Sequence, residues 1–290
     1  MTSVEPPERL RKANFDDLYT SPDPRAYYRA LRPLDYRVPH HGSGFFRSVL
    51  ARLPVGDRVP RVLDLCCSYG INGALLKYDV EFEELYDHYC APDAADLPVD
   101  GLLRRDREFF GPRGRSPGAH VTGLDTSAAA IAYGREAGLL DAGHVRDLER
   151  DEPSGDLVAT MAGVDLVTTT GGVGYITERT FDRLFRALPA TPGRSVPWVA
   201  AVVLRVFPYD GIARTLARYG LTTRRLGAPV PQRRFRDAAE QADALAALDR
   251  LGVDPTGHED DGHFYADLYL SAPAAAHPAL GIPAARRARE

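Results

Sequence analysis

Residues 61–77, RVLDLCCSYGINGALLK, decide the fold, because they predict a strand, a sharp turn and the start of a helix in quick succession. The aliphatic run 61–63 ends at Asp64, a turn containing Ser and Gly follows, and residues 71–77 have a helical composition. This arrangement places a carboxylate at the carboxyl end of a strand, beside the free N–H groups of a helix N-terminus. Such a corner suits a cofactor that carries a ribose or an amino acid.

Composition limits the classes of protein that the chain can belong to. Its 290 residues, 44% of them hydrophobic, suffice for one large domain with a full core. The formal net charge of −4 argues against general affinity for nucleic acid. The Arg-rich stretches at 104–107, 224–225 and 233–234 are interpreted as solvated faces. The expected partner is a small-molecule substrate and not a nucleic acid, and a homodimer is left open.

The cysteines and the N-terminus predict a cytoplasmic protein. Cys66 and Cys67 are adjacent and poorly placed to pair, and with Cys90 they form no CxxC or Cys/His metal spacing, so reduced thiols and no metal are expected. The first residues, MTSVEPPERLRKANFDD, contain no apolar stretch typical of a signal peptide. No apolar run is long enough to span a bilayer, so no membrane partner is expected.

Two segments flank or interrupt the predicted core domain, which spans 60–272. Residues 1–59 form an aromatic-rich helical segment or lid, with helices expected at 24–31 and 44–53, the second capped by Ser43. Residues 79–118 are an insertion of about forty residues where two to six are usual, and they predict a second lid. Its expected helices are 82–90 and 100–110. Residues 1–14 are expected to fray, and 273–290 to form a flexible tail.

The remaining chain alternates between strands and helices. Strands are predicted at 120–125, 145–148, 164–170, 198–207, 221–226 and 263–271. Helices are predicted at 128–138, 177–189, 211–219 and 234–251. This order indicates an α/β protein with a mostly parallel sheet and helices on both faces. The last two strands lack a simple crossover helix and are expected to form an antiparallel pair at one edge.

Ligands of such sheets lie over the carboxyl ends of the strands. Four chain segments are expected to meet there: 64–70, 125–126, 147–148 and 168–172. Asp125 lies 55 residues after Gly70. Without the insertion, the separation would be roughly fifteen, close to the spacing of about twenty at which an acidic residue accepts hydrogen bonds from a ribose.

These four motifs resemble those of class I S-adenosylmethionine-dependent methyltransferases. VLDLCCSYG resembles the family's first motif, GLDTS the second, Asp147-Leu148 the adenine-binding position, and DLVTTTGGVGYI the fourth motif. The resemblance covers about 60–272 and implies a Rossmann-like methyltransferase fold: a mostly parallel seven-stranded sheet, helices on both faces and an antiparallel edge strand. It also implies S-adenosylmethionine as the cofactor. The cofactor-binding residues that it implies are Asp64, Cys66, Ser68, Tyr69, Gly70, Asp125, Thr126, Ser127, Asp147, Leu148, Thr170, Gly171 and Gly172.

The first turn departs from the family pattern. Cys66 and Ser68 stand where the family prefers glycine, and only Gly70 persists. Glycine permits unusual φ angles and a close backbone approach, so the turn either tolerates two small side chains or changes the pose of the cofactor's methionine part. A Rossmann dehydrogenase is disfavoured, because the turn lacks the GxGxxG spacing.

Acceptor-side candidates come from the fourth strand end, the first turn, the leading segment and the insertion. The catalytic candidates are Tyr175, Tyr69 and His41. Tyr175 follows the fourth strand, whose end faces the methyl group, and a histidine could act as a general base. The substrate-binding candidates are Tyr27, Tyr28, Tyr36, Arg37 and Tyr89.

Three functions follow from this resemblance. The first is a methyltransferase that acts on a small molecule, in the small-molecule biosynthesis of specialised metabolism. The sequence has no DPPY- or NPPY-like stretch, which is typical of enzymes that methylate nucleic-acid bases. The second is an enzyme that cyclises the cofactor to azetidine-2-carboxylate and methylthioadenosine. The third is a non-catalytic scaffold that binds the cofactor. The sequence does not identify the acceptor.

Overall fold

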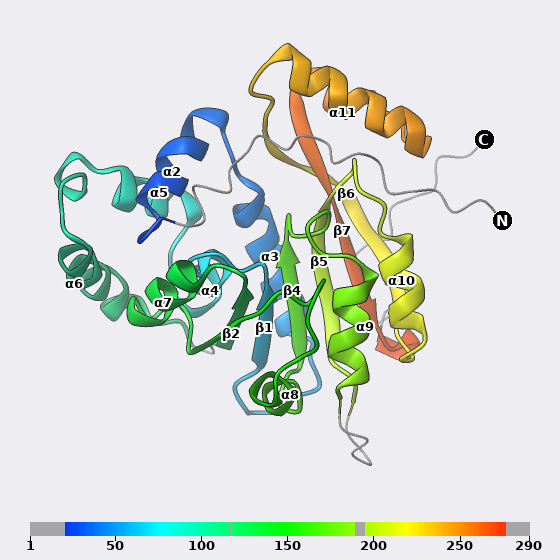
Figure 1. Ribbon diagram of the computed structural model, residues 1–290, viewed down its shortest axis with the longest axis horizontal. Helices are drawn as coiled ribbons and strands as arrows, with labels where there is room; N and C mark the ends of the chain where they lie inside the picture. Colours follow the sequence, from blue (N-terminus) through cyan, green and yellow to red (C-terminus); the bar gives the residue numbers. More distant parts are fainter. Residues whose placement is uncertain (1–20, 117, 189–194, 277–290) are drawn as a thin grey trace.

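A seven-stranded sheet forms the centre of the molecule, with strand order β3-β2-β1-β4-β5-β7-β6 (Figure 1). The structure is a computed structural model that describes residues 21–116, 118–188 and 195–276. The strands are β1 (Arg61–Leu65), β2 (His120–Asp125), β3 (Ala142–Val145), β4 (Leu166–Thr170), β5 (Trp198–Leu204), β6 (Thr222–Arg234) and β7 (His263–Ala272). The first five run parallel, and β7 runs antiparallel to both of its neighbours, β5 and β6. The predicted fold class and the antiparallel pair at one edge are confirmed.

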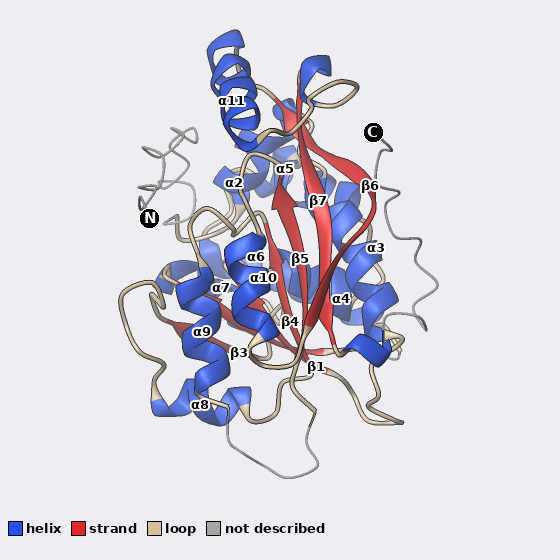
Figure 2. Ribbon diagram, turned by 90° about the vertical axis from the view of Figure 1, so that its right-hand side faces the viewer, coloured by secondary structure: helices blue, strands red, loops and turns tan. Residues whose placement is uncertain are grey.

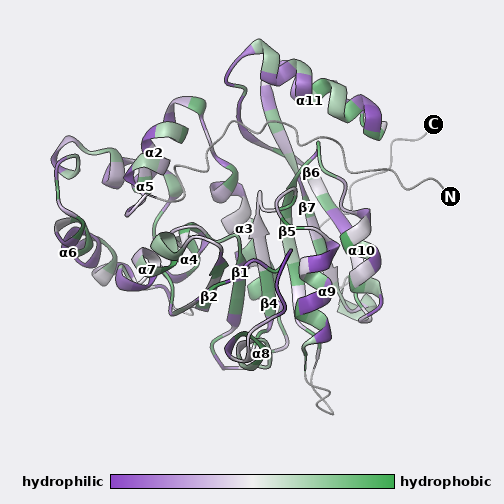
Figure 3. Cartoon of the chain, in the orientation of Figure 1, coloured by the Kyte–Doolittle hydropathy of each residue, from purple (hydrophilic) through white to green (hydrophobic). Residues whose placement is uncertain are grey.

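Helices cover both faces of the sheet (Figure 2). They are α2 (Arg25–Leu31), α3 (Val38–Leu50), α4 (Ile71–Lys77), α5 (Phe82–Cys90), α6 (Val99–Phe110), α7 (Ala128–Glu136), α8 (Gly155–Met161), α9 (Glu178–Arg186), α10 (Asp210–Ala217) and α11 (Ala238–Leu251). Successive strand residues alternate between the faces: Val62 packs with α3 and α4, whereas Leu63 packs with α8, α9 and α10. Figure 3 shows the hydrophobic colour concentrated on the central strands, which places the core there.

The leading segment and the insertion pack together against α4 and α7. Tyr27, Tyr28 and Leu31 of α2 share one buried cluster with Leu85 of α5 and Leu102 of α6. The predicted insertion helices are therefore confirmed, with α5 at the predicted bounds and α6 beginning one residue early. Residues 1–20 and 277–290 lie outside the described residues, and with them the predicted frayed start and most of the predicted tail.

Polar contacts fasten this helical layer. The Arg25 guanidinium donates to the carbonyls of Ala94, Ala95 and Leu97 at 2.8 to 3.0 Å, and it also pairs with Asp23. One arginine thus closes the loop between α5 and α6 onto the leading segment.

The predicted bounds of two elements, the helix at 44–53 and the strand at 145–148, were wrong. Helix α3 begins at Val38 and not at 44, so Ser43 is not its N-cap; the Ser43 hydroxyl donates to the carbonyl of His40 within the helix. Pro39 lies in the first turn, where its missing N–H has no cost. Strand β3 spans Ala142–Val145, so it ends at the residue where the predicted strand, 145–148, was expected to begin. The chain turns at Asp147, whose side chain accepts a hydrogen bond from the Glu149 N–H and whose carbonyl accepts one from Arg150.

The C-terminal edge strand is longer than predicted. β6 continues from Thr222 to Arg234 and not only to 226, because two register shifts accommodate Gly227, Pro229 and Pro231. Proline is tolerated there since an edge strand leaves some N–H groups unpaired. The following helix accordingly begins at Ala238, with Asp237 as its N-cap, and not at 234.

Candidate functional site

The turn between β1 and α4 follows a left-handed backbone path. Cys66, Ser68 and Gly70 have φ angles of 55°, 51° and 85°. The left-handed region costs a non-glycine residue about 1–2 kcal/mol. The turn therefore keeps the path that glycine would favour, and Cys66 and Ser68 add small side chains to it. Hydrogen bonds hold it in place: the Cys66 N–H donates to the carbonyl of Leu124, at the end of β2, over 2.8 Å.

Asp64 lies at the end of β1 and is fully buried. Its Oδ1 accepts hydrogen bonds from the Asn72 amide at 2.9 Å and the Thr168 hydroxyl at 2.7 Å, whereas its Oδ2 is buried without a partner. Burial raises the pKa of Asp64 to about 7, although these two hydrogen bonds lower it. A buried carboxylate oxygen with no donor can accept from a ligand.

Asp125, at the end of β2, ties two turns together. Its carboxylate accepts from the N–H of Ser68 at 2.8 Å and from the N–H of Ser127 at 3.0 Å. Ser127 in turn caps α7, as predicted, by accepting from the Ala130 N–H. Each carboxylate oxygen can accept more than one hydrogen bond, and Asp125 is only half-buried. Asp125 can therefore bind a further donor, such as a ribose hydroxyl.

The end of β4 closes the other side of the turn. A Cβ atom added at Gly172 would lie 3.0 Å from the Cys66 Sγ and 2.4 Å from the Thr169 Oγ1, so no larger residue fits at this position. Thr170 reaches the Asn72 amide at 3.3 Å, and Asn72 also holds Asp64. The first and fourth predicted motifs are thus in direct contact.

Helix α3 crosses this end of the sheet. A Cβ atom at Gly42 would lie 3.3 Å from the Thr170 hydroxyl, which places the first half of α3 beside the tip of β4. The neighbouring His41 is half-buried, and its Nε2 has no hydrogen-bond partner. Burial lowers the pKa of His41, and so do the nearby His40 and Arg37, so a neutral imidazole lies at this position at neutral pH.

Several elements at this end of the sheet carry buried polar atoms that have no hydrogen-bond partner. These atoms include the Asp64 Oδ2, the Ser68 Oγ, the Thr169 Oγ1 and the His41 Nε2. Most buried polar groups in proteins are hydrogen-bonded, so a group of such atoms indicates a place for a polar ligand. These residues fit the amino-acid end of the predicted cofactor, and Asp125 fits its ribose. Within the described ranges, no group of three or more His, Cys, Asp or Glu side chains is arranged to hold a metal ion.

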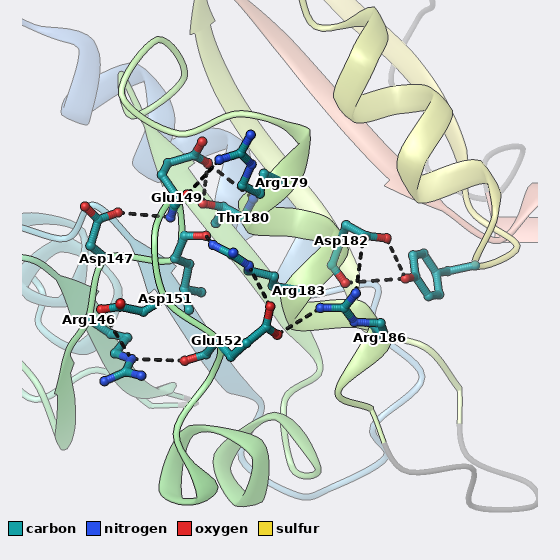
Figure 4. Close-up of polar contacts among 12 residues, drawn as sticks. Arg146, Asp147, Glu149, Asp151, Glu152, Arg179, Thr180, Asp182, Arg183 and Arg186 are labelled. Carbon is teal, nitrogen blue, oxygen red and sulfur yellow. Dashed lines mark hydrogen bonds and ion pairs between the residues drawn. The ribbon is translucent and has the colours of Figure 1, made fainter.

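The loop after β3 carries the predicted adenine-binding residues Asp147 and Leu148 and is held by polar contacts to α9 (Figure 4). The Arg146 N–H donates to the carbonyl of Asp125, so this loop joins the same edge of the sheet. Leu148 is buried and Asp147 is half-buried. Of the other predicted cofactor-binding residues, Thr126 is exposed, whereas Gly171 adopts a φ of 66° beside β4.

The substrate-binding candidates from the leading segment and the insertion lie in two different places. Tyr27, Tyr28 and Tyr89 are buried within the helical layer, where the Tyr28 and Tyr89 rings stack at 4.7 Å. Tyr36 is half-buried with its ring 6.1 Å from that of Tyr27, and Arg37 is exposed and paired with Asp35. The structure therefore brings Tyr36 and Arg37 to the start of α3, while the other three lie in the interior of the helical layer.

The two tyrosine candidates for catalysis differ in their surroundings. Tyr69 is fully buried in the turn, and its hydroxyl donates to the carbonyl of Ser21 at 2.8 Å. Burial raises the pKa of Tyr69, so its hydroxyl remains protonated at neutral pH. Tyr175 is 46% exposed in the loop between β4 and α9.

Sequence reasoning missed three polar residues of this region. Asn72 and Thr168 hold Asp64, and Glu149 holds the β3–α8 loop. Asn72 could have been noticed as the polar residue in the otherwise apolar start of α4. The segment 168–172 was expected at this edge, but nothing identified Thr168 as a partner of Asp64 or Glu149 as an anchor of the loop, because these partners are distant in the sequence. Cys66, Cys67 and Cys90 are free thiols in the structure.

Comparison with known proteins gives similarity only in structure. No family model matches the chain, and no curated protein matches it. Geranyl diphosphate C-methyltransferase from Streptomyces coelicolor A3(2) is similar, with 14% identity, 80% of this chain and 79% of that chain covered, and a TM-score of 0.38. A TehB-like SAM-dependent methyltransferase from Corynebacterium glutamicum has 16% identity, coverage of 79% and 86%, and a TM-score of 0.38. The [4+2]-cyclase SpnF has 15% identity, coverage of 79% and 80%, and a TM-score of 0.37.

None of the helices in the described parts of the chain has the length and apolar character needed to cross a membrane.

Proposed function

We propose that this protein is an S-adenosylmethionine-dependent methyltransferase that acts on a small molecule. The observation that carries the proposal is the unpartnered Asp64 Oδ2 and Ser68 Oγ at the β1–α4 turn, where the Ser68 N–H also donates to Asp125. A cofactor with an ammonium group, a carboxylate and a ribose matches these donors and acceptors. When bound, it would supply a methyl group already activated by the sulfonium.

The chain's own residues divide this binding task between them. Asp64 accepts from the ammonium group through its Oδ2, while Asn72 and Thr168 hold its other oxygen. Asp125 accepts from the ribose hydroxyls. Asp147 and Leu148 border the adenine. Gly172 lets the tip of β4 pack closely against Cys66 of the turn, since a Cβ atom there would overlap Thr169 and Cys66.

The acceptor would approach between the tip of β4 and the start of α3. Holding a nucleophile in line with an activated methyl group can supply roughly 7–11 kcal/mol of the barrier. His41, neutral and with an unpartnered Nε2, can remove a proton from an acceptor that carries one. Tyr36 and Arg37, which precede α3, are the proposed substrate contacts on this side.

Cyclisation of the cofactor is a second candidate. The observation that favours it is the pair Cys66 and Ser68, whose side chains alter the turn beside the methionine part. The amine would attack the γ-carbon as the carbon–sulfur bond breaks, and Asp64, with its unpartnered oxygen and raised pKa, would take the ammonium proton. The products are azetidine-2-carboxylate and methylthioadenosine.

Two measurements test the proposal. Calorimetry with adenosylhomocysteine should give binding with one site per chain, and Asp125→Ala should weaken it. Incubation with S-adenosylmethionine and a panel of small hydroxyl and amine acceptors should give adenosylhomocysteine only with an acceptor. Methylthioadenosine formed without any acceptor would favour cyclisation over methyl transfer. Binding without turnover would indicate a non-catalytic scaffold. Absence of binding would refute the methyltransferase, the cyclising enzyme and the scaffold alike.

A further inference from the structure

The loop between β3 and α8 is fastened to α9 through one carboxylate. The Glu149 side chain accepts four hydrogen bonds: from the N–H and hydroxyl of Thr177 at 2.8 and 2.9 Å, and from the N–H and hydroxyl of Thr180 at 3.2 and 2.7 Å. These N–H groups lie at the N-cap and in the first turn of α9, where backbone donors lack the usual i−4 partner; the Thr180 N–H is shared with the Thr177 carbonyl at 3.2 Å. Glu149 therefore caps a helix whose N-cap residue, Thr177, lies 28 residues further along the chain.

Other contacts complete the attachment (Figure 4). The Arg183 guanidinium donates to the carbonyl of Leu148 at 2.6 Å, and the Arg179 guanidinium donates to the carbonyl of Glu149 at 3.1 Å. Burial by itself would raise the pKa of Glu149, but the hydrogen bonds from Thr177 and Thr180 lower it, so the carboxylate is charged at neutral pH. Hydrogen bonds to a charged group are about twice as strong as neutral ones.

The same loop contains another glutamate, Glu152, that contributes much less to the attachment of the loop to α9. Glu152 pairs with Arg183 and Arg186, but its side chain is 62% exposed. Exposed ion pairs contribute little to stability, typically about 0–1 kcal/mol. Glu149 and Glu152 thus form a matched pair of variants in one loop, one holding α9 through the backbone and hydroxyl donors of Thr177 and Thr180, the other through the side chains of Arg183 and Arg186.

We propose that Glu149 is a positioning residue that determines how well the protein distinguishes adenine from other bases. By fixing the loop to α9, it holds the Asp147 carboxylate and the Leu148 backbone at the border of the base. This inference rests on the proposed function. A fixed carboxylate accepts from the 6-amino group of adenine and is repelled by the 6-oxo group of hypoxanthine, whereas a loose loop accommodates either base.

The test uses two probes, S-adenosylhomocysteine and S-inosylhomocysteine, which differ at this 6-position. Calorimetry should give the wild type at least about tenfold tighter binding of the adenosyl compound, as expected for one hydrogen bond to a charged group. Glu149→Ala should weaken the binding of S-adenosylhomocysteine about tenfold and the binding of S-inosylhomocysteine by less. The ratio of the two dissociation constants should therefore fall toward one. Glu152→Ala should leave both constants within about twofold.

Hydrogen exchange provides a readout that is independent of binding. Without cofactor, amides 146–152 should exchange faster in Glu149→Ala and at the wild-type rate in Glu152→Ala. If Glu149→Ala does not fold, Thr180→Val, which removes one buried donor at nearly constant volume, should lower the ratio of dissociation constants by a smaller factor.

Several results would overturn the inference. They are a wild-type ratio near one, a ratio unchanged in a folded Glu149→Ala protein, or an equal fall of the ratio in Glu152→Ala. If the wild type binds neither probe, the proposed function itself fails, which is a different result from a wild type that binds both probes equally.

Discussion

Asp64 and Glu149 are both carboxylates at the carboxyl edge of the sheet, yet their surroundings are opposite. Asp64 is fully buried, has one oxygen without a partner, and has a pKa that burial raises to about 7. Glu149 is half-buried, accepts four hydrogen bonds, and has a pKa that those bonds lower although burial opposes them. A carboxylate whose hydrogen-bonding capacity is used within the protein stabilises the fold, whereas one with a buried free oxygen can bind a ligand.

Backbone strain follows the same division. Among the described residues, the non-glycine residues with positive φ are Asp35, Cys66 and Ser68, and two of the three lie in the turn after Asp64. The loop that carries Glu149 has none. Strained backbone persists where the surrounding structure holds it, and it is frequent at binding sites. The described non-glycine residues with positive φ thus cluster in the β1–α4 turn, beside the unpartnered oxygen of Asp64, and none lies in the β3–α8 loop, whose Glu149 is fully hydrogen-bonded.

Removing Asp64 should have the largest effect on binding. Asp64→Ala should weaken the binding of adenosylhomocysteine about 100-fold, or by about 2.7 kcal/mol, because the ligand's ammonium group loses a buried charged acceptor. Calorimetry measures the dissociation constant. Asp182→Ala, a carboxylate variant on α9 that only loses contacts to Arg218, Arg186 and Tyr219, serves as the control and should bind normally. Equal dissociation constants for the two variants would contradict the role of Asp64.

The pH dependence of stability should differ in sign between the two carboxylates. The pKa of Asp64 is raised in the folded state, so its contribution is fully present below its ordinary value of 3.8 and is lost as pH rises through about 7. Between pH 5 and 7 the wild type without cofactor should lose on the order of 2 kcal/mol relative to Asp64→Asn. Urea unfolding at several pH values measures this difference, and parallel curves would exclude a raised pKa.

Glu149 should give the opposite trend. Its folded-state pKa is lowered, so its contribution is present above the ordinary value of 4.5 and is lost as pH falls through the folded-state value. At pH 6, Glu149→Gln should be less stable than the wild type by about 1–2 kcal/mol. The difference should shrink in acid below pH 4.5, as measured by urea unfolding. A constant difference from pH 3 to pH 7 would show that the charge of Glu149 is not what matters.

Relieving the strain in the turn should have a smaller effect. Cys66→Gly and Ser68→Gly should each raise the free energy of unfolding by up to about 1 kcal/mol, because the left-handed penalty exceeds the entropic cost of glycine. Ala95→Gly, at a φ of −60°, is the control and should lower it by about 0.5–1 kcal/mol. Urea unfolding at one pH compares the three variants. Destabilisation by both turn variants would mean that packing of the Cys66 and Ser68 side chains outweighs the strain.

Tyr175 should show the smallest effect on the cofactor. Tyr175→Phe should leave the dissociation constant of adenosylhomocysteine within about twofold, because an exposed hydroxyl contributes little to binding at a neighbouring site. Calorimetry tests this, and a role on the acceptor side would then appear only in turnover. A tenfold loss of cofactor binding would move Tyr175 into the cofactor site.

Local pattern predicted the order of elements but was less reliable at their ends. The apolar run 198–207 predicted the buried strand β5, and the spacing of apolar residues predicted α9. The predicted helix at 44–53 and the predicted strand at 221–226 were both too short, since Pro39 lies in the first turn of α3 and Pro229 and Pro231 lie in the edge strand β6. The effect of a proline depends on whether its position needs an N–H, and sequence alone does not specify this.

The sequence by itself determined the α/β alternation, the turn at 64–70 and the acidic residues at the strand ends, because these depend on neighbours a few residues apart. Only the tertiary structure decided which polar groups are satisfied. Asp64 meets Asn72 and Thr168 from two other elements, and Glu149 meets the start of α9. Hydrogen bonds between distant segments depend on how the strands and helices pack, so composition and periodicity cannot distinguish an occupied carboxylate from one that is open to a ligand.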